Sequence, residues 1–288
     1  MSSIPPWDSS GIHATAVIHP QAELHPSVTV GPHSVIGPHV KIGDGTTVGP
    51  NVVIDGWTTI GEHNRIFPGA VIGMEPQDLK YNGAPSRVSI GNHNRIRECV
   101  TIHRATREGE STVIGDQNLL MAYVHVAHNC VIADQVIISN SVGLAGHVQI
   151  ESRAVLGGMA GIHQFTHIGQ LAMVGAMSRI DRDVPPYLRV EGHPGRIRGL
   201  NPVGLKRANF SPEAILLLKR AYRILYRSGL PLEKAVQTLR HWPEMLSEGE
   251  GSRPLNHLLN FLEDSLNQEH RRGLLPVYRS SRQEEGED

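Results

Sequence analysis

Aliphatic residues recur at every sixth position over more than half of this chain. Between residues 12 and 174 there are 28 positions in this register, and 25 of them hold Ile, Leu or Val. The next residue is often glycine, as at Gly31, Gly49 and Gly157, which permits close backbone approach at a corner. A six-residue period with one buried aliphatic side chain predicts one short strand and one turn per hexapeptide.

Three such hexapeptides make one triangular coil, so the pattern predicts a β-solenoid whose neighbouring coils pair as parallel strands. The period does not define the hand of the coil. The aliphatic register is broken at Asp78, Ala84 and Glu108 and resumes after each break. These breaks predict two loop excursions from an intact coil, near residues 74–89 and 104–112. Insertions in a solenoid gather on one face and commonly carry function.

A helical region follows the repeat. Ser211 before Pro212 has the form of a helix N-cap followed by proline at the first helical position. Residues 214–227 then show helical spacing, and Gly229 falls where a C-terminal cap is expected. Further helices are expected over residues 232–242 and 254–269.

The expected fold class is therefore mainly β, with the solenoid and its two excursions over residues 1–195. A C-terminal α-helical domain is expected over residues 196–275. The last residues are polar and charged, which predicts a disordered tail over residues 276–288.

The composition is that of an ordinary soluble protein, with 39% hydrophobic and 19% charged residues. A formal net charge of −1 gives no general attraction to nucleic acid or to a membrane surface. No secretory leader is recognisable, and no segment reaches the ~18 apolar residues of a membrane span. Two cysteines, Cys99 and Cys130, favour a reducing compartment over a disulfide scaffold. We expect a cytoplasmic protein without a nucleic-acid partner or an integral membrane segment.

Histidine is abundant, with 17 residues, and part of this set follows the coil period. A solenoid stacks residues 18 apart at a spacing of roughly 4.8 Å. Residues just after positions 126, 144 and 162 should therefore lie near one corner of successive coils, and His125 lies just before the same corner. They supply a base, a backbone N–H donor and an amide, as acyl transfer requires; surface histidines hydrogen-bonded at turns are the alternative. The set comprises His125, His128, Gly146, His147, His163 and Gln164.

A group of short motifs, found from about Ile12 to Gly229, resembles the UDP-N-acetylglucosamine O-acyltransferase family. Hexapeptide repeats alone are shared by many transferases. The loop Gln77-Asp78-Leu79-Lys80-Tyr81 together with the histidine column is the specific part of the resemblance. The other motifs span residues 97–104, 118–121, 125–128, 144–147, 162–165, 183–187 and 204–207.

The resemblance implies a left-handed parallel β-helix and an enzyme without a cofactor or a metal. Members of the family transfer a 3-hydroxyacyl group from acyl carrier protein to the 3-hydroxyl of UDP-N-acetylglucosamine, the first step of lipid A biosynthesis, with no covalent acyl-enzyme. The resemblance also implies a homotrimer with sites between subunits, and docking of the acidic carrier protein on a basic helical face; a solvated helix face is the simpler interpretation. The basic residues are Lys206, Arg207, Lys219, Arg220, Arg223 and Arg227.

Site roles follow from the motifs position by position. The resemblance makes His128 the general base and the Gly146 N–H the oxyanion donor. It makes Ala176 the residue that limits acyl length. The remaining positions hold substrate: Asp78 and Lys80 contact the sugar and acyl portions, His125, His147, His163 and Gln164 line the sugar and diphosphate site, and Asn201 and Arg207 contact the nucleotide.

The chain departs from the family pattern at several of these positions. Asn129 follows the base where the family often has Asp, so an amide is expected to orient the imidazole without stabilising its charge. Val203 and Ala208 replace residues that are often Glu and Arg near the nucleotide. Ala176 stands where glycine would leave more room, which predicts a shorter acyl chain.

Three other functions remain open from the sequence. Histidines on a hexapeptide solenoid can form a zinc site like that of gamma-type carbonic anhydrases. A solenoid can also be a non-catalytic scaffold, although its corner would then hold inert residues. The third alternative is N-acyl transfer to a 3-amino sugar nucleotide, whose enzymes carry an additional N-terminal domain.

Overall fold

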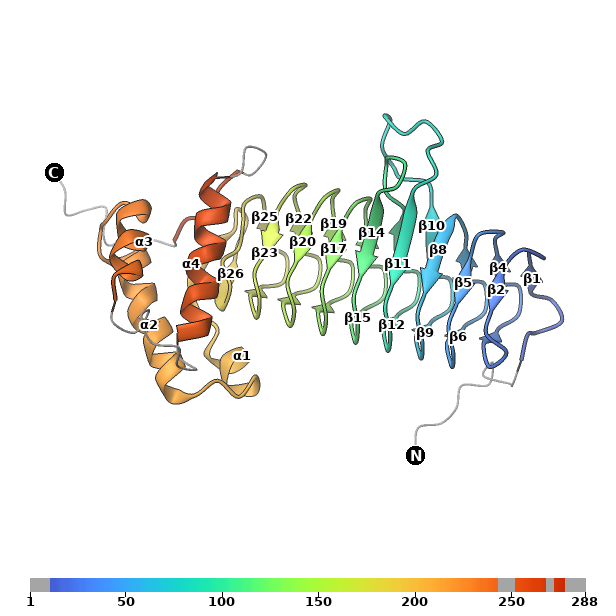
Figure 1. Cartoon of the computed structure of the whole chain (residues 1–288), viewed down its shortest axis with the longest axis horizontal. Helices are drawn as coiled ribbons and strands as arrows, with labels where there is room; N and C mark the ends of the chain where they lie inside the picture. The colour runs from blue at the N-terminus through green and yellow to red at the C-terminus, as the bar shows by residue number, and fades with distance from the viewer. Residues whose placement is uncertain (1–10, 243–251, 268–271, 278–288) are drawn as a thin grey trace.

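The computed structural model describes residues 11–242, 252–267 and 272–277. A long three-sided coil of short strands carries a group of helices at its C-terminal end (Figure 1). This is the left-handed parallel β-helix with C-terminal helices that the resemblance implied, and the predicted fold class is confirmed. The expected disordered tail lies outside the described residues from position 278 onward.

Each side of the coil is one sheet, and successive strands of a sheet belong to successive coils, except that β26 and β27 pair antiparallel at the end of the third sheet. The first sheet contains β1 (Val17–Ile18), β4 (Val35–Ile36), β7 (Val53–Ile54), β10 (Val71–Met74), β13 (Thr101–His103), β16 (His125–Val126), β19 (Gly143–Leu144), β22 (Gly161–Ile162) and β25 (Arg179–Ile180). The second contains β2 (Glu23–Leu24), β5 (Lys41–Ile42), β8 (Trp57–Ile60), β11 (Arg87–Ile90), β14 (Ser111–Ile114), β17 (Val131–Ile132), β20 (Gln149–Ile150) and β23 (His167–Ile168). The third contains β3 (Thr29–Val30), β6 (Thr47–Val48), β9 (Arg65–Ile66), β12 (Arg95–Ile96), β15 (Leu119–Leu120), β18 (Ile137–Ile138), β21 (Val155–Leu156), β24 (Met173–Val174), β26 (Leu188–Glu191) and β27 (Arg196–Leu200).

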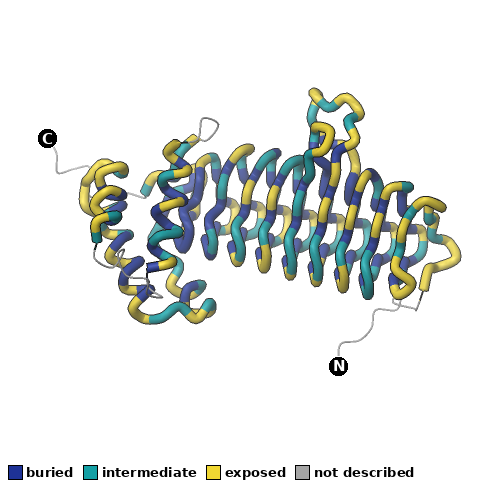
Figure 2. Tube along the Cα trace, viewed as in Figure 1, coloured by how far each residue is buried: buried dark blue, intermediate teal, exposed yellow. Residues whose placement is uncertain are grey.

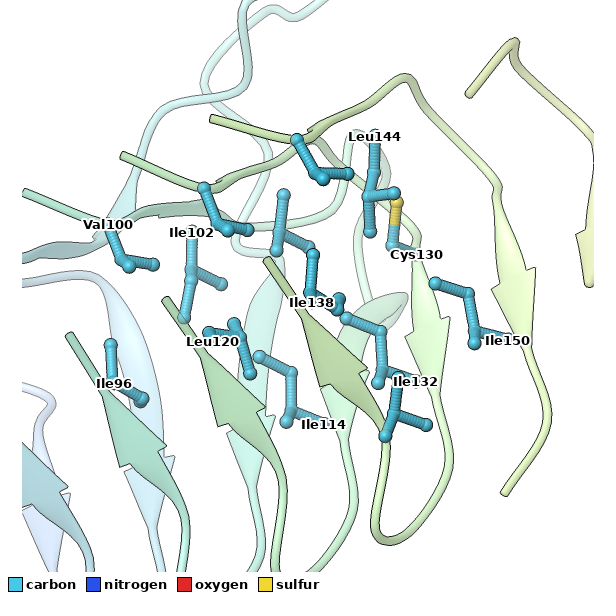
Figure 3. Close-up of a cluster of buried hydrophobic side chains, with 14 of the residues drawn as sticks. Ile96, Val100, Ile102, Ile114, Leu120, Cys130, Ile132, Ile138, Leu144 and Ile150 are labelled. Carbon is cyan, nitrogen blue, oxygen red and sulfur yellow. The ribbon is translucent and has the colours of Figure 1, made fainter. Parts of the chain in front are cut away.

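The aliphatic residue of each hexapeptide points into the coil. Alternation along a strand turns one residue of each pair inward and its neighbour outward, which gives the banded burial of Figure 2. The inward side chains stack coil upon coil, and Ile102, Leu120 and Ile138 are fully buried among them (Figure 3). The corner glycines explain how the coils approach so closely: a Cβ at Gly49 would lie 3.0 Å from the Ile66 carbonyl oxygen.

Both predicted excursions return to the coil in register, with one irregularity between Ile72 and Met74 where the first excursion leaves. In a regular coil the paired residues are 18 apart, as with Lys41 and Glu23. Arg87 of β11 instead pairs with Trp57 of β8, and Ser111 of β14 pairs with Arg87. The longer separations place residues 75–86 and 104–110 outside the coil as two loops on the same side (Figure 1).

The helices close the C-terminal end of the coil. They are α1 (Pro202–Arg207), α2 (Pro212–Arg227), α3 (Leu232–Arg240) and α4 (Ser252–Asn267). The predicted cap of α2 is confirmed, since the Ala214 N–H donates to the Ser211 hydroxyl at 3.1 Å. Gly229 has the left-handed φ of +76° expected after a helix. The sequence pattern did not predict α1, which is only six residues long.

A cluster of polar side chains joins α4 to the coil. The Glu151 carboxylate accepts hydrogen bonds from Nε2 of His167 and from Nε2 of His257, both at 3.0 Å. His257 belongs to α4, and its Nδ1 lies 2.7 Å from the Tyr187 hydroxyl. Phe261 of α4 packs on the His167 ring. Within the described residues, no helix is long and apolar enough to cross a membrane.

Candidate active site

A hollow of about 910 Å³ lies between the two excursions and one corner of the coil. It is the corner that follows β16, β19 and β22, where the sequence analysis placed the histidine column. Residues of both loops line the hollow together with this corner. The predicted site residues that line it are Asp78, Lys80, His125, His128, Gly146, His147 and Gln164.

The base and the predicted oxyanion donor are in direct contact. A Cβ built on Gly146 would lie 2.4 Å from Cε1 and 2.6 Å from Nε2 of His128, so the imidazole covers this glycine. The neighbouring N–H groups of Ala145 and His147 donate to the carbonyls of Ile162 and His128. In the described part of the chain, the Gly146 N–H has no such partner.

Hydrogen bonds at the other ring nitrogen fix the orientation of His128. Nδ1 lies 3.0 Å from Oδ1 of Asn129. The same oxygen accepts from the backbone N–H and the hydroxyl of Thr106, each at 3.2 Å. The Asn129 amide nitrogen donates to the Glu110 carboxylate at 2.7 Å. The second excursion, which carries Thr106 and Glu110, is thereby tied to the base.

The histidines around the base are held in the neutral form. Burial lowers the pKa of His147, and the nearby His128 adds to this effect. Burial also lowers the pKa of His103 and of His125. The His147 ring stacks on Phe165 at 4.8 Å and meets His128 edge-on at 5.2 Å. Neutral rings at this corner are suited to exchange hydrogen bonds with hydroxyl and phosphate groups.

Asp78 lies opposite the base on the first excursion. Its Oδ2 is 3.9 Å from His128 Nε2, which is longer than a hydrogen bond and leaves that nitrogen open to a ligand. Asp78 Oδ1 accepts from the Lys80 N–H at 3.0 Å, and its carbonyl accepts from the Tyr81 N–H. This turn at the tip of the loop directs the Asp78 side chain toward the base.

A buried arginine holds the first excursion against the coil. Nη1 of Arg104 donates to the Gly73 carbonyl at 2.9 Å. Nη2 donates to the Tyr81 hydroxyl at 2.8 Å and pairs with Glu75 at 3.3 Å. The guanidinium also faces the Tyr81 ring. Arg104 therefore determines where the loop that carries Asp78 lies.

The other predicted residues lie outside this hollow. His163 lines an adjoining groove of about 480 Å³, which shares His125 with the main hollow. Within the described ranges, Asn201, Arg207 and Ala176 line neither space. Asn201 caps α1: its Oδ1 accepts from the Gly204 N–H, and its Nδ2 donates to the Leu171 carbonyl, each at 3.0 Å.

Cys130 is unsuited to nucleophilic attack, although it follows the base by two residues. The side chain is fully buried and faces the Ala145 carbonyl at 3.2 Å. Burial raises the pKa of the Cys130 thiol to about 12. The thiolate, which is the reactive form, is thus disfavoured at neutral pH.

The sequence analysis missed several lining residues. The second excursion contributes most of them, because loop residues do not follow the coil period. Their only sequence signal was the interruption of the aliphatic register at Glu108. The missed residues are His103, Thr106, Arg107, Glu110 and Phe165.

No metal site is formed by the side chains that the structure describes: no three His, Cys, Asp or Glu residues are grouped so that they could hold an ion. Similarity to known proteins distinguishes the acyltransferase from the zinc-site and scaffold alternatives. The solenoid matches the bacterial transferase hexapeptide profile over residues 39–73 and 111–146. With its loops and histidine-lined hollow, the chain is therefore a transferase of the hexapeptide-repeat class.

Residues 183–275 match the profile described as UDP N-acetylglucosamine O-acyltransferase, domain 2. An acyl-[acyl-carrier-protein]–UDP-N-acetylglucosamine O-acyltransferase of Gloeothece citriformis is 59% identical over 77% of this chain and 78% of its own length. One from Thermodesulfovibrio yellowstonii is 49% identical over 88% of this chain and 96% of its own. The chain belongs to the UDP-N-acetylglucosamine O-acyltransferase family and is an acyltransferase.

Solved structures of the same family superpose closely on this chain. The UDP-N-acetylglucosamine O-acyltransferase of Moraxella catarrhalis superposes with a TM-score of 0.85 at 40% identity, covering 92% of this chain and 99% of the other. The UDP-N-acetylglucosamine acyltransferase of Francisella novicida gives a TM-score of 0.85 at 38% identity, with coverage of 94% and 95%. Family membership decides against the carbonic-anhydrase-like and scaffold alternatives.

Proposed function

We propose that this enzyme transfers a 3-hydroxyacyl group from acyl carrier protein to the 3-hydroxyl of UDP-N-acetylglucosamine, the first step of lipid A biosynthesis. The observation that carries this proposal is the pairing of His128 with Gly146 beneath the loop that holds Asp78. A base and a backbone donor on one side of a single hollow are the two groups that acyl transfer needs.

In this mechanism Nε2 of His128 removes the proton from the sugar 3-hydroxyl as its oxygen attacks the thioester carbonyl. The Gly146 N–H donates to the oxyanion of the tetrahedral intermediate. Collapse of the intermediate breaks the carbon–sulfur bond, and His128 returns the proton to the carrier thiolate. No covalent acyl-enzyme forms at Cys130, because its thiol is buried and protonated.

The remaining polar groups position the substrates. Asp78 and Lys80 hold the sugar and the acyl portion where the first excursion meets the base. Histidines on the coil, together with an amide, line the sugar and diphosphate. Asn201 and Arg207 contact the nucleotide from a second copy of the chain. The coil residues are His125, His147, His163 and Gln164.

We also propose that the active enzyme is a homotrimer. Tyr123, Met159 and Met177 lie on one corner of the coil and expose 65%, 61% and 66% of their surface. They occupy equivalent positions in coils of 18 residues, with the exposed Ser141 between Tyr123 and Met159, so this corner of the solenoid exposes several large apolar side chains. Large apolar patches on a protein surface commonly mark an interface. Ala176 is next to this corner and would limit acyl length there.

We propose that the solenoid carries the chemistry and that the carrier protein docks on the helices that follow β27, in particular α1 and α2. The docking face is basic, and every member of it is exposed. An acidic carrier protein would associate with it by charge complementarity in the cytoplasm. The face comprises Lys206, Arg207, Lys219, Arg220, Arg223 and Arg227.

The test is direct assay of the purified protein with UDP-N-acetylglucosamine and 3-hydroxyacyl carrier proteins of graded length, with product detected by mass spectrometry. The His128→Ala variant should lose activity by about 10²-fold or more, whereas the exposed His19→Ala control should match wild type. A parallel reaction contains the 3-amino sugar nucleotide. If product forms only from the 3-amino acceptor, the enzyme is an N-acyltransferase and not an O-acyltransferase. If neither acceptor gives product, the proposed function is refuted.

A further inference from the structure

The Asn129 side chain has a defined orientation because its three contacts admit only one. Its Oδ1 faces the backbone N–H of Thr106, which can only donate. Its Nδ2 faces the Glu110 carboxylate at 2.7 Å, which accepts when ionised. If the two amide atoms were exchanged, Nδ2 would face the Thr106 N–H, so that two donors would meet. Oδ1 would then face the Glu110 carboxylate, so that two acceptors would meet.

This orientation determines the tautomer of the base. The atom that His128 Nδ1 meets at 3.0 Å is Oδ1 of Asn129, which carries no hydrogen. Nδ1 must therefore hold the ring proton and donate it, so that Nε2 of the neutral ring carries the lone pair. Nε2 is the nitrogen that covers Gly146 and faces Asp78 in the hollow. The amide thus turns the basic nitrogen toward the substrate.

The carboxylate beyond the amide adds a charge to this chain of hydrogen bonds. When His128 accepts a proton, its positive charge strengthens the bond from Nδ1 to Asn129, and a polarised amide donates more strongly to Glu110. Hydrogen bonds with one ionised partner are roughly twice as strong as neutral ones. A carboxylate one residue removed from the imidazole can therefore stabilise its cation, although the residue in contact is neutral.

We propose that Glu110 is a positioning residue that acts on His128 through Asn129, so that the three residues work as one unit during acyl transfer. The inference deepens the proposed function and rests on it. It goes beyond the expectation that Asn129 only orients the ring. The other charged or titratable side chains that line the hollow with His128 are Asp78, Lys80, His103, Arg107, His125 and His147.

Exchanging the amide of Asn129 and the carboxylate of Glu110 tests whether these two residues act together with His128. Glu110→Gln keeps the shape and the hydrogen bond from Asn129 but removes the charge, so kcat should fall about tenfold with KM for the sugar nucleotide unchanged. Asn129→Asp should also lower kcat, because two carboxylates would then meet. Glu110→Gln combined with Asn129→Asp restores one amide and one carboxylate and should recover activity to within about threefold.

Glu108→Gln is the matched control, because Glu108 is an exposed carboxylate on the same excursion. Melting temperature and oligomeric state of every variant establish that each is folded. Wild-type kcat in Glu110→Gln, a rise in KM alone, or a double variant as slow as the product of the two single effects would each overturn the proposal. Because wild-type turnover is measured in the same assay, failure of the proposed function would be recognised separately.

Discussion

The His128 imidazole lies so close to Gly146 that a single added methyl group would meet its Cε1 at 2.4 Å. No real Cβ tolerates that distance, so either the ring or the corner of the coil would move. Since the base packs directly on the residue that carries the proposed oxyanion donor, any change at Gly146 affects both groups together.

Gly146→Ala should therefore lower kcat by about 10²-fold, since a displacement near 1 Å at a reacting group can have such an effect. The melting temperature should decrease only slightly, because the ring can rotate into the hollow. Gly143→Ala is the control for stability, since a Cβ at Gly143 meets nothing within 4 Å. Wild-type kcat in a folded Gly146→Ala enzyme would contradict the proposed site.

Loosening the first excursion should weaken substrate binding. Arg104→Met removes the donors to Gly73, Tyr81 and Glu75, and we expect KM for the sugar nucleotide to rise several-fold. An unsatisfied buried carbonyl also destabilises the fold by about 1–3 kcal/mol. Tyr81→Phe removes one hydroxyl and leaves the Gly73 contact, so its effect should be smaller. Unchanged KM in Arg104→Met would show that the loop position is determined elsewhere.

The junction between α4 and the coil should depend on pH. Burial alone would raise the pKa of Glu151, but hydrogen bonds from His167 and His257 outweigh it and lower the pKa to about 2, from the ordinary value of 4.5. The folded state therefore binds fewer protons than the unfolded state between these values. The contribution to stability, on the order of 3 kcal/mol, is present above pH 4.5 and is lost as the pH falls toward 2.

Urea unfolding of wild type and Glu151→Gln from pH 6 to pH 3 measures this contribution. Wild type should be the more stable protein at pH 6, and the difference should shrink steadily as the pH falls below about 4.5. A difference that stays constant over this range would show that the Glu151 charge does not stabilise the junction.

The Cys130 thiol should be unreactive in the folded protein. Because its thiol is buried with a pKa of about 12, iodoacetamide at pH 7 should modify the exposed Cys99 and leave Cys130 intact. Cys130→Ala should retain kcat within about twofold, with a loss of stability of about 1 kcal/mol from the small cavity. An acyl group found on Cys130 by mass spectrometry would refute the mechanism without a covalent intermediate.

The acyl preference should respond to Ala176. A methyl group at this position leaves less room than glycine, so Ala176→Gly should move the optimum toward longer 3-hydroxyacyl chains. Competition among carrier proteins loaded with graded acyl lengths measures the shift in kcat/KM. The same preference in both proteins would remove Ala176 from the determinants of chain length.

The sequence predicted the coil, the positions of both excursions and the histidine corner because all three depend on one period. Equivalent positions in a solenoid are brought together by the fold itself: Val126 pairs with Leu144, and Leu144 pairs with Ile162. The residues just after them, among them His128 and Gly146, follow from that alignment.

Partners within the loops could not be predicted in this way. Glu110 and Thr106 lie in an excursion whose path is determined by its own hydrogen bonds, so no spacing connects them to Asn129. For the same reason, the sequence suggested that Asn129 was a weaker substitute for a carboxylate. The structure shows instead that a carboxylate is present, one residue further from the ring.

The two excursions leave the coil and return to it in phase, and this separates the scaffold from the chemistry. Because the strands after each loop resume the pairing that an uninterrupted coil would have, the loops can change in length or composition while the stack beneath them keeps its register. The solenoid therefore acts as a scaffold whose loops can be exchanged without changing the strand pairing. Residues 75–86 and 104–110 could be transplanted as a unit to the same corner of another hexapeptide coil.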